Sequence, residues 1–212
     1  MKNLSIILGT IFSLCFMIIT SCSSSTDPAT PNIIWNLQTG NNWTFTDQFM
    51  YPDSVFVDTV FVEISKHHSF NYQNSELIAA CLRESSYSMQ QTPEQITYQL
   101  FNNNDDGLYS YGNLIEQADS TILEISINLL FKFPVEIGDI WQFNSNNIEC
   151  TSHDEPFNTP YGDFSCYVYK LTKTTEITYF YCVPYIGIVG IITEDTSGNT
   201  IYMRILLDYN IG

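Results

Sequence analysis

The residues with the clearest chemical potential are three histidines in two places. His67 and His68 are adjacent, and His153 is followed directly by two acids, Asp154 and Glu155. If the two segments met, their imidazoles and carboxylates would form a metal-binding or acid–base cluster. Adjacent histidines in a polar loop are more often solvated, and neighbouring side chains in a strand point to opposite faces. We therefore expect no catalytic residue and no metal site here.

A second motif, Asn102–Gly107, is similar to the first half of a calcium-binding loop. Oxygen-bearing side chains fall at its first, third and fifth positions, and a glycine follows. Its twelfth position is Asn113 instead of a glutamate, and no flanking helices are predicted. The motif is therefore more typical of a β-turn. The G-x-S-x-G, H-E-x-x-H and phosphate-cradling glycine patterns are absent from the sequence, so we expect a non-enzymatic protein without a cofactor.

The cysteines indicate either cross-links or core positions. Cys81, Cys150, Cys166 and Cys182 follow the N-terminal region, without a C-x-x-C motif and with gaps unlike compact zinc ligation. An exported protein can keep disulfides, whereas free cysteines usually behave as small buried hydrophobes. Both interpretations stay open.

Composition restricts the class of protein. The 212 residues include 23 acidic and 7 basic side chains, for a net charge of −16. An excess of acids disfavours nucleic acid as a partner, because phosphate binding needs a basic surface. Hydrophobic residues make up 44% and aromatic residues 15%, which excludes a disordered acidic tail.

The elements that position these residues have the period of β-strands. Thr121–Phe133 alternates apolar and polar side chains over a long stretch, Pro134 ends it, and Ile140–Phe143 begins the next strand. Further β-rich runs are Trp43–Phe49, Ser54–Ile64, Glu76–Glu84, Asn147–Ser152, Phe164–Lys170, Thr178–Val183, Gly187–Glu194 and Thr200–Tyr209. This density predicts a mainly β protein with little helix: a single large curved antiparallel sheet, a clam or half-barrel.

One segment has mixed signals. Thr92–Gln95 has the cap, proline and glutamine of a helix start, whereas Ile96–Phe101 has strand composition. Asn103–Gly107 then resembles a turn into Leu108–Tyr111, which favours a hairpin.

A hairpin centred on Thr174 would place Cys166 opposite Cys182, within reach of a disulfide. In this register one face carries cysteine, valine and phenylalanine. The other face carries four tyrosines, Tyr167, Tyr169, Tyr179 and Tyr181. A one-residue slip would mix the two sets.

The four tyrosines would form an apolar wall with polar tips. Such a wall suits an acyl chain, a sterol-like molecule or a sugar ring, so these tyrosines are the candidate ligand-binding residues. The alternative, which is more typical of buried aromatic residues, is a face covered by another layer of the core.

The N-terminus is typical of an export signal. Lys2 precedes an apolar run, Leu4–Ile19, that is too short and wrongly flanked for a typical membrane-spanning helix. The run ends in Ile19–Cys22, which resembles the lipobox of bacterial lipoproteins and implies cleavage before Cys22 and lipidation of that residue. We therefore expect a signal peptide over 1–21, a lipidated tether over 22–33 and a β domain over 34–212.

Several further segments occur in a recognisable order: Asp106–Gly112, Phe131–Trp141, Thr159–Phe164 and Tyr181–Val189. This pattern is similar to a family of uncharacterised envelope lipoproteins common in Bacteroidota. The resemblance implies a curved antiparallel sheet related to the β-clam of the lipoprotein carriers. It implies no catalytic residue, and its glycines and proline fit turns.

These observations predict a lipoprotein anchored by Cys22 in the cell envelope. Ser23, after the lipidated cysteine, favours the outer membrane by resemblance. We expect non-enzymatic binding of an apolar or amphipathic ligand, with the lipid anchor as the membrane contact. The alternative is a structural or interaction module that joins an envelope protein complex.

Overall fold

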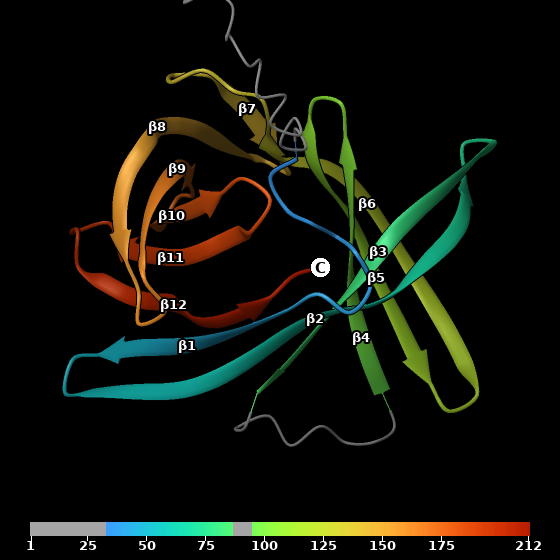
Figure 1. Cartoon of the computed structure of the whole chain (residues 1–212), viewed down its shortest axis with the longest axis horizontal. Helices are drawn as coiled ribbons and strands as arrows, with labels where there is room; N and C mark the ends of the chain where they lie inside the picture. The colour runs from blue at the N-terminus through green and yellow to red at the C-terminus, as the bar shows by residue number, and fades with distance from the viewer. Residues whose placement is uncertain (1–32, 87–94) are drawn as a thin grey trace, which may run out of the picture. The chain divides into compact units, whose positions relative to one another are not determined.

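The alternating segments form strands in the computed structural model, which describes residues 33–86 and 95–212 (Figure 1). The twelve strands are β1 (Asn42–Tyr51), β2 (Ser54–Tyr72), β3 (Ser75–Ser86), β4 (Gln95–Asn104), β5 (Gly107–Gln117), β6 (Ser120–Lys132), β7 (Ile140–Phe143), β8 (Asn146–Asn158), β9 (Asp163–Thr172), β10 (Glu176–Val183), β11 (Gly187–Asp195) and β12 (Thr200–Asn210). In the described part of the chain there is no helix long and apolar enough to cross a bilayer. The predicted signal peptide, Cys22 and most of the tether lie outside the described residues, as do Thr92–Glu94 of the expected helix start.

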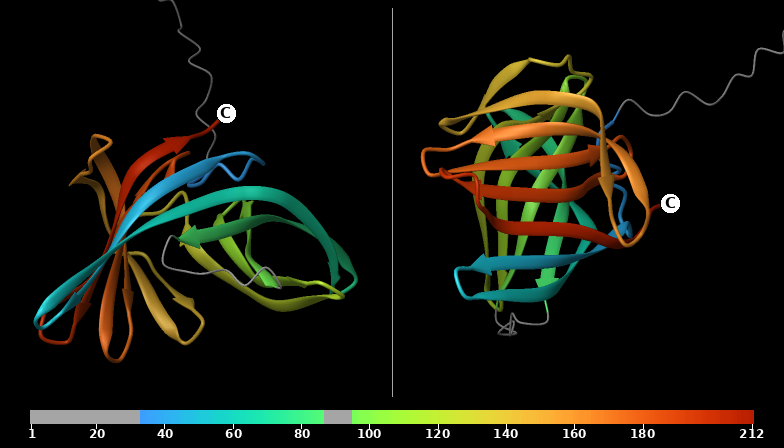
Figure 2. Two further views of the ribbon diagram at one scale, coloured as in Figure 1. Left: turned by 90° about the horizontal axis from the view of Figure 1, so that it is seen from below. Right: turned by 90° about the vertical axis from the view of Figure 1, so that its left-hand side faces the viewer.

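All strands belong to one antiparallel sheet, in the order β6-β5-β4-β3-β2-β1-β12-β11-β10-β9-β8-β7. The sheet curves until its two edge strands, β6 and β7, approach each other (Figure 2). Asn144, directly after β7, donates its backbone N–H to the Oδ1 atom of Asn128 on β6 at 3.4 Å. The prediction of a single curved antiparallel sheet is therefore confirmed.

The hairpin preferred for 96–111 is also confirmed. β4 and β5 pair from Asn104 opposite Gly107 onward, so the Asn102–Gly107 motif is the end of a hairpin. Gly107 has a φ of +145°, a conformation that a glycine adopts without penalty. The Asn102–Gly107 motif is therefore explained by the requirements of a β-turn.

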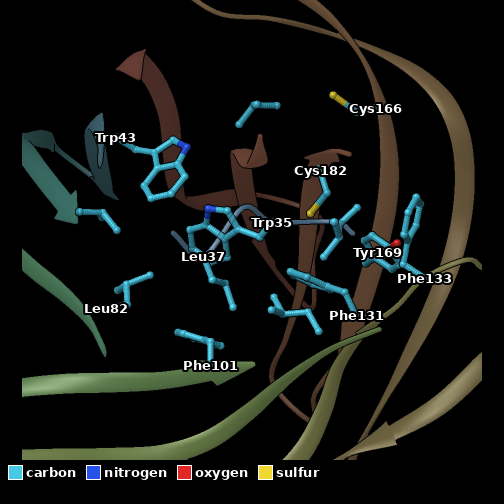
Figure 3. Close-up of a cluster of buried hydrophobic side chains, with 14 of the residues drawn as sticks. Trp35, Leu37, Trp43, Leu82, Phe101, Phe131, Phe133, Cys166, Tyr169 and Cys182 are labelled. Carbon is cyan, nitrogen blue, oxygen red and sulfur yellow. The ribbon is translucent and has the colours of Figure 1, made fainter. Parts of the chain in front are cut away.

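The sheet buries a core on each of its faces. Most of the first core lies on the concave side, including Trp43, Phe131 and Tyr169, which Figure 3 shows. The second core, on the opposite face, includes Cys81 and Leu100. Strands β2–β5 contribute to both cores because successive side chains alternate between the two faces.

A short segment before β1 lies inside the curve of the sheet (Figure 1). Ile34 and Trp35 are almost fully buried, and Trp35 forms a β-bridge with Ile186. Asn103 of β4 donates its Nδ2 N–H to the backbone oxygen of Trp35 at 2.8 Å. This segment therefore connects β4 with the residues just before β11, which lie on the two sides of the curved sheet, and it brings the indole ring of Trp35 into the interior.

Candidate ligand-binding groove

The tyrosine wall predicted on the β9–β10 hairpin is not formed, because the register is shifted by one residue. Cys182 pairs with Tyr167, Phe180 with Tyr169, and Tyr181 with Val168. The loop has two residues, Thr174 and Thr175, instead of three centred on Thr174. The backbone N–H of Lys173 bonds to the oxygen of Glu176 at 2.9 Å, and their side chains form an ion pair at 2.6 Å. Since the side-chain period of a strand is two, this shift moves one strand's side chains to the other face.

The four tyrosines consequently divide between the two faces. Tyr167 and Tyr169 share the concave face with Phe180, whereas Tyr179 and Tyr181 lie on the other face. Tyr169 is fully buried, stacks on Phe131 with ring centroids 4.7 Å apart, and donates its hydroxyl to the oxygen of Lys132. It belongs to the core, as the alternative interpretation proposed.

Cys166 and Cys182, predicted to face each other, point to opposite faces of the hairpin. Both are free and fully buried, as are Cys81 and Cys150. Burial raises the pKa of Cys166 to about 12, and it raises the pKa of Cys182 well above its usual range. At neutral pH these thiols are protonated and act as small core side chains.

The three histidines do not meet. His67 and His68 lie within β2, not in a loop, and on opposite faces of the sheet. His67 contacts the hydroxyl of Thr39 at 3.1 Å, whereas His68 stacks on Phe70. His153 lies on β8 against Tyr167. Among the described residues, no three histidine, cysteine or acidic side chains are grouped so that they could hold a metal ion.

The concave face contains a mainly apolar pocket of about 190 Å³ within the first core. We call it the apolar pocket. Its apolar walls come from the segment before β1 and from strands of both sides of the clam: Trp35, Phe45, Val62, Leu82, Phe101, Leu130, Phe180, Ile188 and Ile191. Figure 3 shows Trp35, Leu82 and Phe101 around this interior, and the ring centroids of Trp35 and Phe101 are 5.8 Å apart. Glu84, Gln99 and Arg204 supply its polar lining.

Arg204 binds two carboxylates beside this pocket. Its Nε and Nη2 atoms donate to Asp47, each at 2.7 Å, and its Nη1 and Nη2 atoms donate to Glu84 at 3.0 and 2.9 Å. Tyr202 donates its hydroxyl to Asp47 at 2.9 Å. Burial alone would lower the pKa of Arg204, but the hydrogen bonds to Asp47 and Glu84 raise it. The guanidinium therefore stays charged, and two carboxylates facing one cation leave the cluster with a net negative charge.

A wider groove of about 550 Å³ adjoins the apolar pocket and shares four lining residues with it: Glu84, Phe180, Ile191 and Arg204. Beyond Arg204 its walls include Thr178 and Thr193, whose hydroxyls are 3.1 Å apart. An apolar space of 190 Å³ is large enough for a ring or a short hydrocarbon segment, since an engineered cavity of about 150 Å³ binds benzene. The adjoining groove provides room for the remainder of a larger molecule.

Sequence reasoning missed the residues of this groove. One signal was present: Asp47 interrupts the inward-facing series Trp43, Phe45 and Phe49 of β1. An acid at a core-facing position needs a cationic or hydrogen-bonding partner. The identity of that partner depends on pairing between β1 and β12, which are distant in the chain.

Comparisons with known proteins found two solved structures with limited similarity. A Bacteroides fragilis protein, described as exported and with a YmcC-like fold, has a TM-score of 0.41 and 12% identity over 85% of this chain and 100% of its own. A Parabacteroides distasonis protein, described as a lipoprotein, has a TM-score of 0.41 and 9% identity over 84% of this chain and 99% of its own. No family model and no curated protein matches the chain.

Proposed function

We propose that this chain is a lipid-anchored lipoprotein of the cell envelope, at the outer membrane, whose β body binds an amphipathic ligand without chemical conversion. The lipobox-like Ile19–Cys22 supports the anchor. The observation that carries the ligand is the apolar pocket beside the Arg204 cluster. The apolar part of the ligand lies in the apolar pocket beside Trp35 and Phe101, and its polar part extends past Gln99 or Arg204.

The charge of the site restricts the polar part. The Arg204 cluster has two carboxylates for one guanidinium, and the whole chain carries a net charge of −16. An anionic headgroup would be repelled by this field and would compete with Asp47 and Glu84 for the guanidinium. The ligand is therefore an amphiphile with an uncharged or cationic polar end.

A fluorescent apolar probe tests this proposal. N-phenyl-1-naphthylamine should bind the Cys22→Ser protein saturably, and Ile191→Phe, which fills the apolar pocket, should weaken binding roughly tenfold. The matched control is Ile192→Phe, on the opposite face of β11, which should bind like the parent. Absence of saturable binding, or equal losses in both variants, would contradict ligand binding in the pocket.

A second candidate function is an interaction module. The end of the β1–β2 hairpin exposes large apolar side chains on both of its faces: Phe49, Tyr51, Val55, Phe56 and Val57. Exposed apolar patches commonly mark protein contacts. Cross-linking in cells should then trap a stoichiometric envelope protein with the parent, and Val55→Thr with Val57→Thr should abolish the product. A cross-linked product that persists in this variant would exclude the hairpin as the contact.

A further inference from the structure

We propose that the polar end of the ligand is an uncharged, polyhydroxylated ring of the sugar type, held in a second pocket beside the apolar one. This inference rests on the proposed function and defines its class of ligand: a glycosylated amphiphile. We call the second site the amide pocket.

The amide pocket has a volume of about 380 Å³ and no charged residue in its lining. Its polar groups are side-chain amides and hydroxyls: Gln99, Ser110, Asn113, Ser126, Asn128 and Asn144. Such groups can both donate and accept hydrogen bonds, as sugar hydroxyls do. This lining differs from that of the wider groove around Arg204, where ionised side chains dominate the polar groups.

Cross-strand register brings these side chains together. Phe101 of β4 pairs with Ser110 of β5, which pairs with Asn128 of β6, and in a neighbouring row Gln99 pairs with Asn113. A register shift in β5 lets Ser110 and Asn113 line the same pocket, although they are an odd number of positions apart.

Gly112 is required within this shifted segment. It has a φ of +108°, and a Cβ atom there would lie 2.0 Å from the backbone oxygen of Glu124. The close approach of β5 to β6 therefore depends on the glycine. The pocket floor is built by paired strands, which hold their side chains more rigidly than a loop would.

Hydrogen bonds within the pocket orient some amides and leave others available. Asn128 donates to the Oγ atom of Ser126 at 2.9 Å and accepts from the backbone N–H of Asn144 at 3.4 Å. Among the residues that the structure describes, the side chain of Gln99 makes no hydrogen bond, and it is exposed. Its amide is therefore free to bind a hydroxyl.

The amide pocket and the apolar pocket are continuous. They share Gln99, Phe101 and Leu130. Phe101 and Phe143, from β4 and β7, also line the amide pocket, and aromatic rings suit the apolar C–H surface of a sugar ring. A single amphiphile can therefore place hydrocarbon beside Trp35 and an uncharged ring among the amides.

Two probes with the same hydrocarbon chain test this inference. Octyl β-D-glucoside carries a sugar ring, whereas octyl tetraethylene glycol is uncharged and has none. With both below their critical micelle concentrations, calorimetry on the Cys22→Ser protein should give at least about fivefold tighter binding of the glucoside. The side-chain amide NMR signals of Asn113 and Asn128 should shift with the glucoside and not with the glycol.

Variants locate the preference. Asn113→Leu with Asn128→Leu keeps side-chain size and removes the amides, so the glucoside should lose its advantage while glycol binding stays within about twofold. Asn71→Leu, on an exposed position of β2, is the matched control and should keep the preference. Gln99→Met repeats the test with a single exposed residue if the double variant does not fold.

The outcomes separate the two proposals. Equal binding of both probes, or a glucoside preference that survives in the double variant and in Gln99→Met, would overturn the sugar site and leave the apolar pocket intact. If neither probe bound, the proposed function itself would be wrong.

Discussion

Arg204 and Asp47 face each other across β12 and β1 and form a two-pronged ion pair, with both N···O distances at 2.7 Å. The side chain of Asp47 is 5% exposed and that of Arg204 is 13% exposed. Glu84 of β3 extends the pair into a cluster that links three strands. β1 is the first strand in the sequence and β12 is the last, and the two are paired neighbours in the sheet. The cluster therefore stabilises the pairing between the first and last strands.

Replacing the cation should strongly destabilise the fold. Arg204→Met leaves Asp47 buried without its partner, and breaking a buried ion pair from one side typically costs about 3–5 kcal/mol. We expect a corresponding fall in the free energy of unfolding, measured by urea titration followed by tryptophan fluorescence. Lys173→Met, which breaks the exposed pair with Glu176, should cost at most about 1 kcal/mol. Equal costs would show that the Arg204 cluster is no more important than a surface pair.

Gly187 should control the position of Trp35. It has a φ of +93°, and a Cβ atom there would lie 2.3 Å from the indole ring. Gly187→Ala should therefore displace the indole, shift the tryptophan emission to the red and lower stability. The matched control is Gly198→Ala, with a φ of +81° and open space around it, where only backbone strain of roughly 1–2 kcal/mol applies. An unchanged emission spectrum in Gly187→Ala would contradict the tight contact.

The strands could be predicted from the sequence because their signal is local. Period two and turn residues located segments in all twelve strands, and the turn residues Asn103–Gly107 favoured the β4–β5 hairpin over a helix start. The β9–β10 register was wrong by one residue because the sequence Lys173–Glu176 contains no glycine or asparagine that would fix the loop length. A tight two-residue loop and a three-residue loop fit that composition equally well.

The groove could not be predicted because its parts come from distant strands. Arg204 and Asp47 are 157 positions apart, and each lies within an ordinary β segment. Cys166, Cys182 and the four tyrosines follow a regular local pattern, and that pattern alone predicted the disulfide and the ligand-binding wall. The contacts that form the groove depend on sheet order, which the period of a strand does not encode.

Stability should fall in alkaline solution because of the buried thiols. Burial raises the pKa of Cys81 and Cys150 to about 11 and that of Cys166 to about 12, from an ordinary 9.0. The folded state therefore holds these protons more tightly than the unfolded state. This stabilisation is complete below about pH 9 and is lost as the pH rises toward 11 or 12.

Urea midpoints measured from about pH 8 to about pH 10.5 should decline over the upper part of that range. Burial also raises the pKa of several tyrosines, Tyr169 and Tyr202 most of all, so buried phenols add to the decline. Cys166→Ala removes one of the groups and should flatten the curve relative to the parent, whatever its effect at neutral pH. A curve of the same slope in both proteins would exclude the thiol as a contributor.

Lipidation at Cys22 should determine where the protein resides in the cell. The parent should partition into the detergent phase of a Triton X-114 extraction, because two or three acyl chains hold a protein stably at a membrane. It should also lose its first 21 residues. Cys22→Ser removes the acceptor thiol, so the protein should move to the aqueous phase once its apolar run Leu4–Ile19 has been removed. Cys81→Ser, at a buried core position, is the matched control and should stay with the detergent. Detergent partitioning of Cys22→Ser without its first 21 residues would mean that membrane association comes from the β body, and the exposed end of the β1–β2 hairpin would then be the first surface to test.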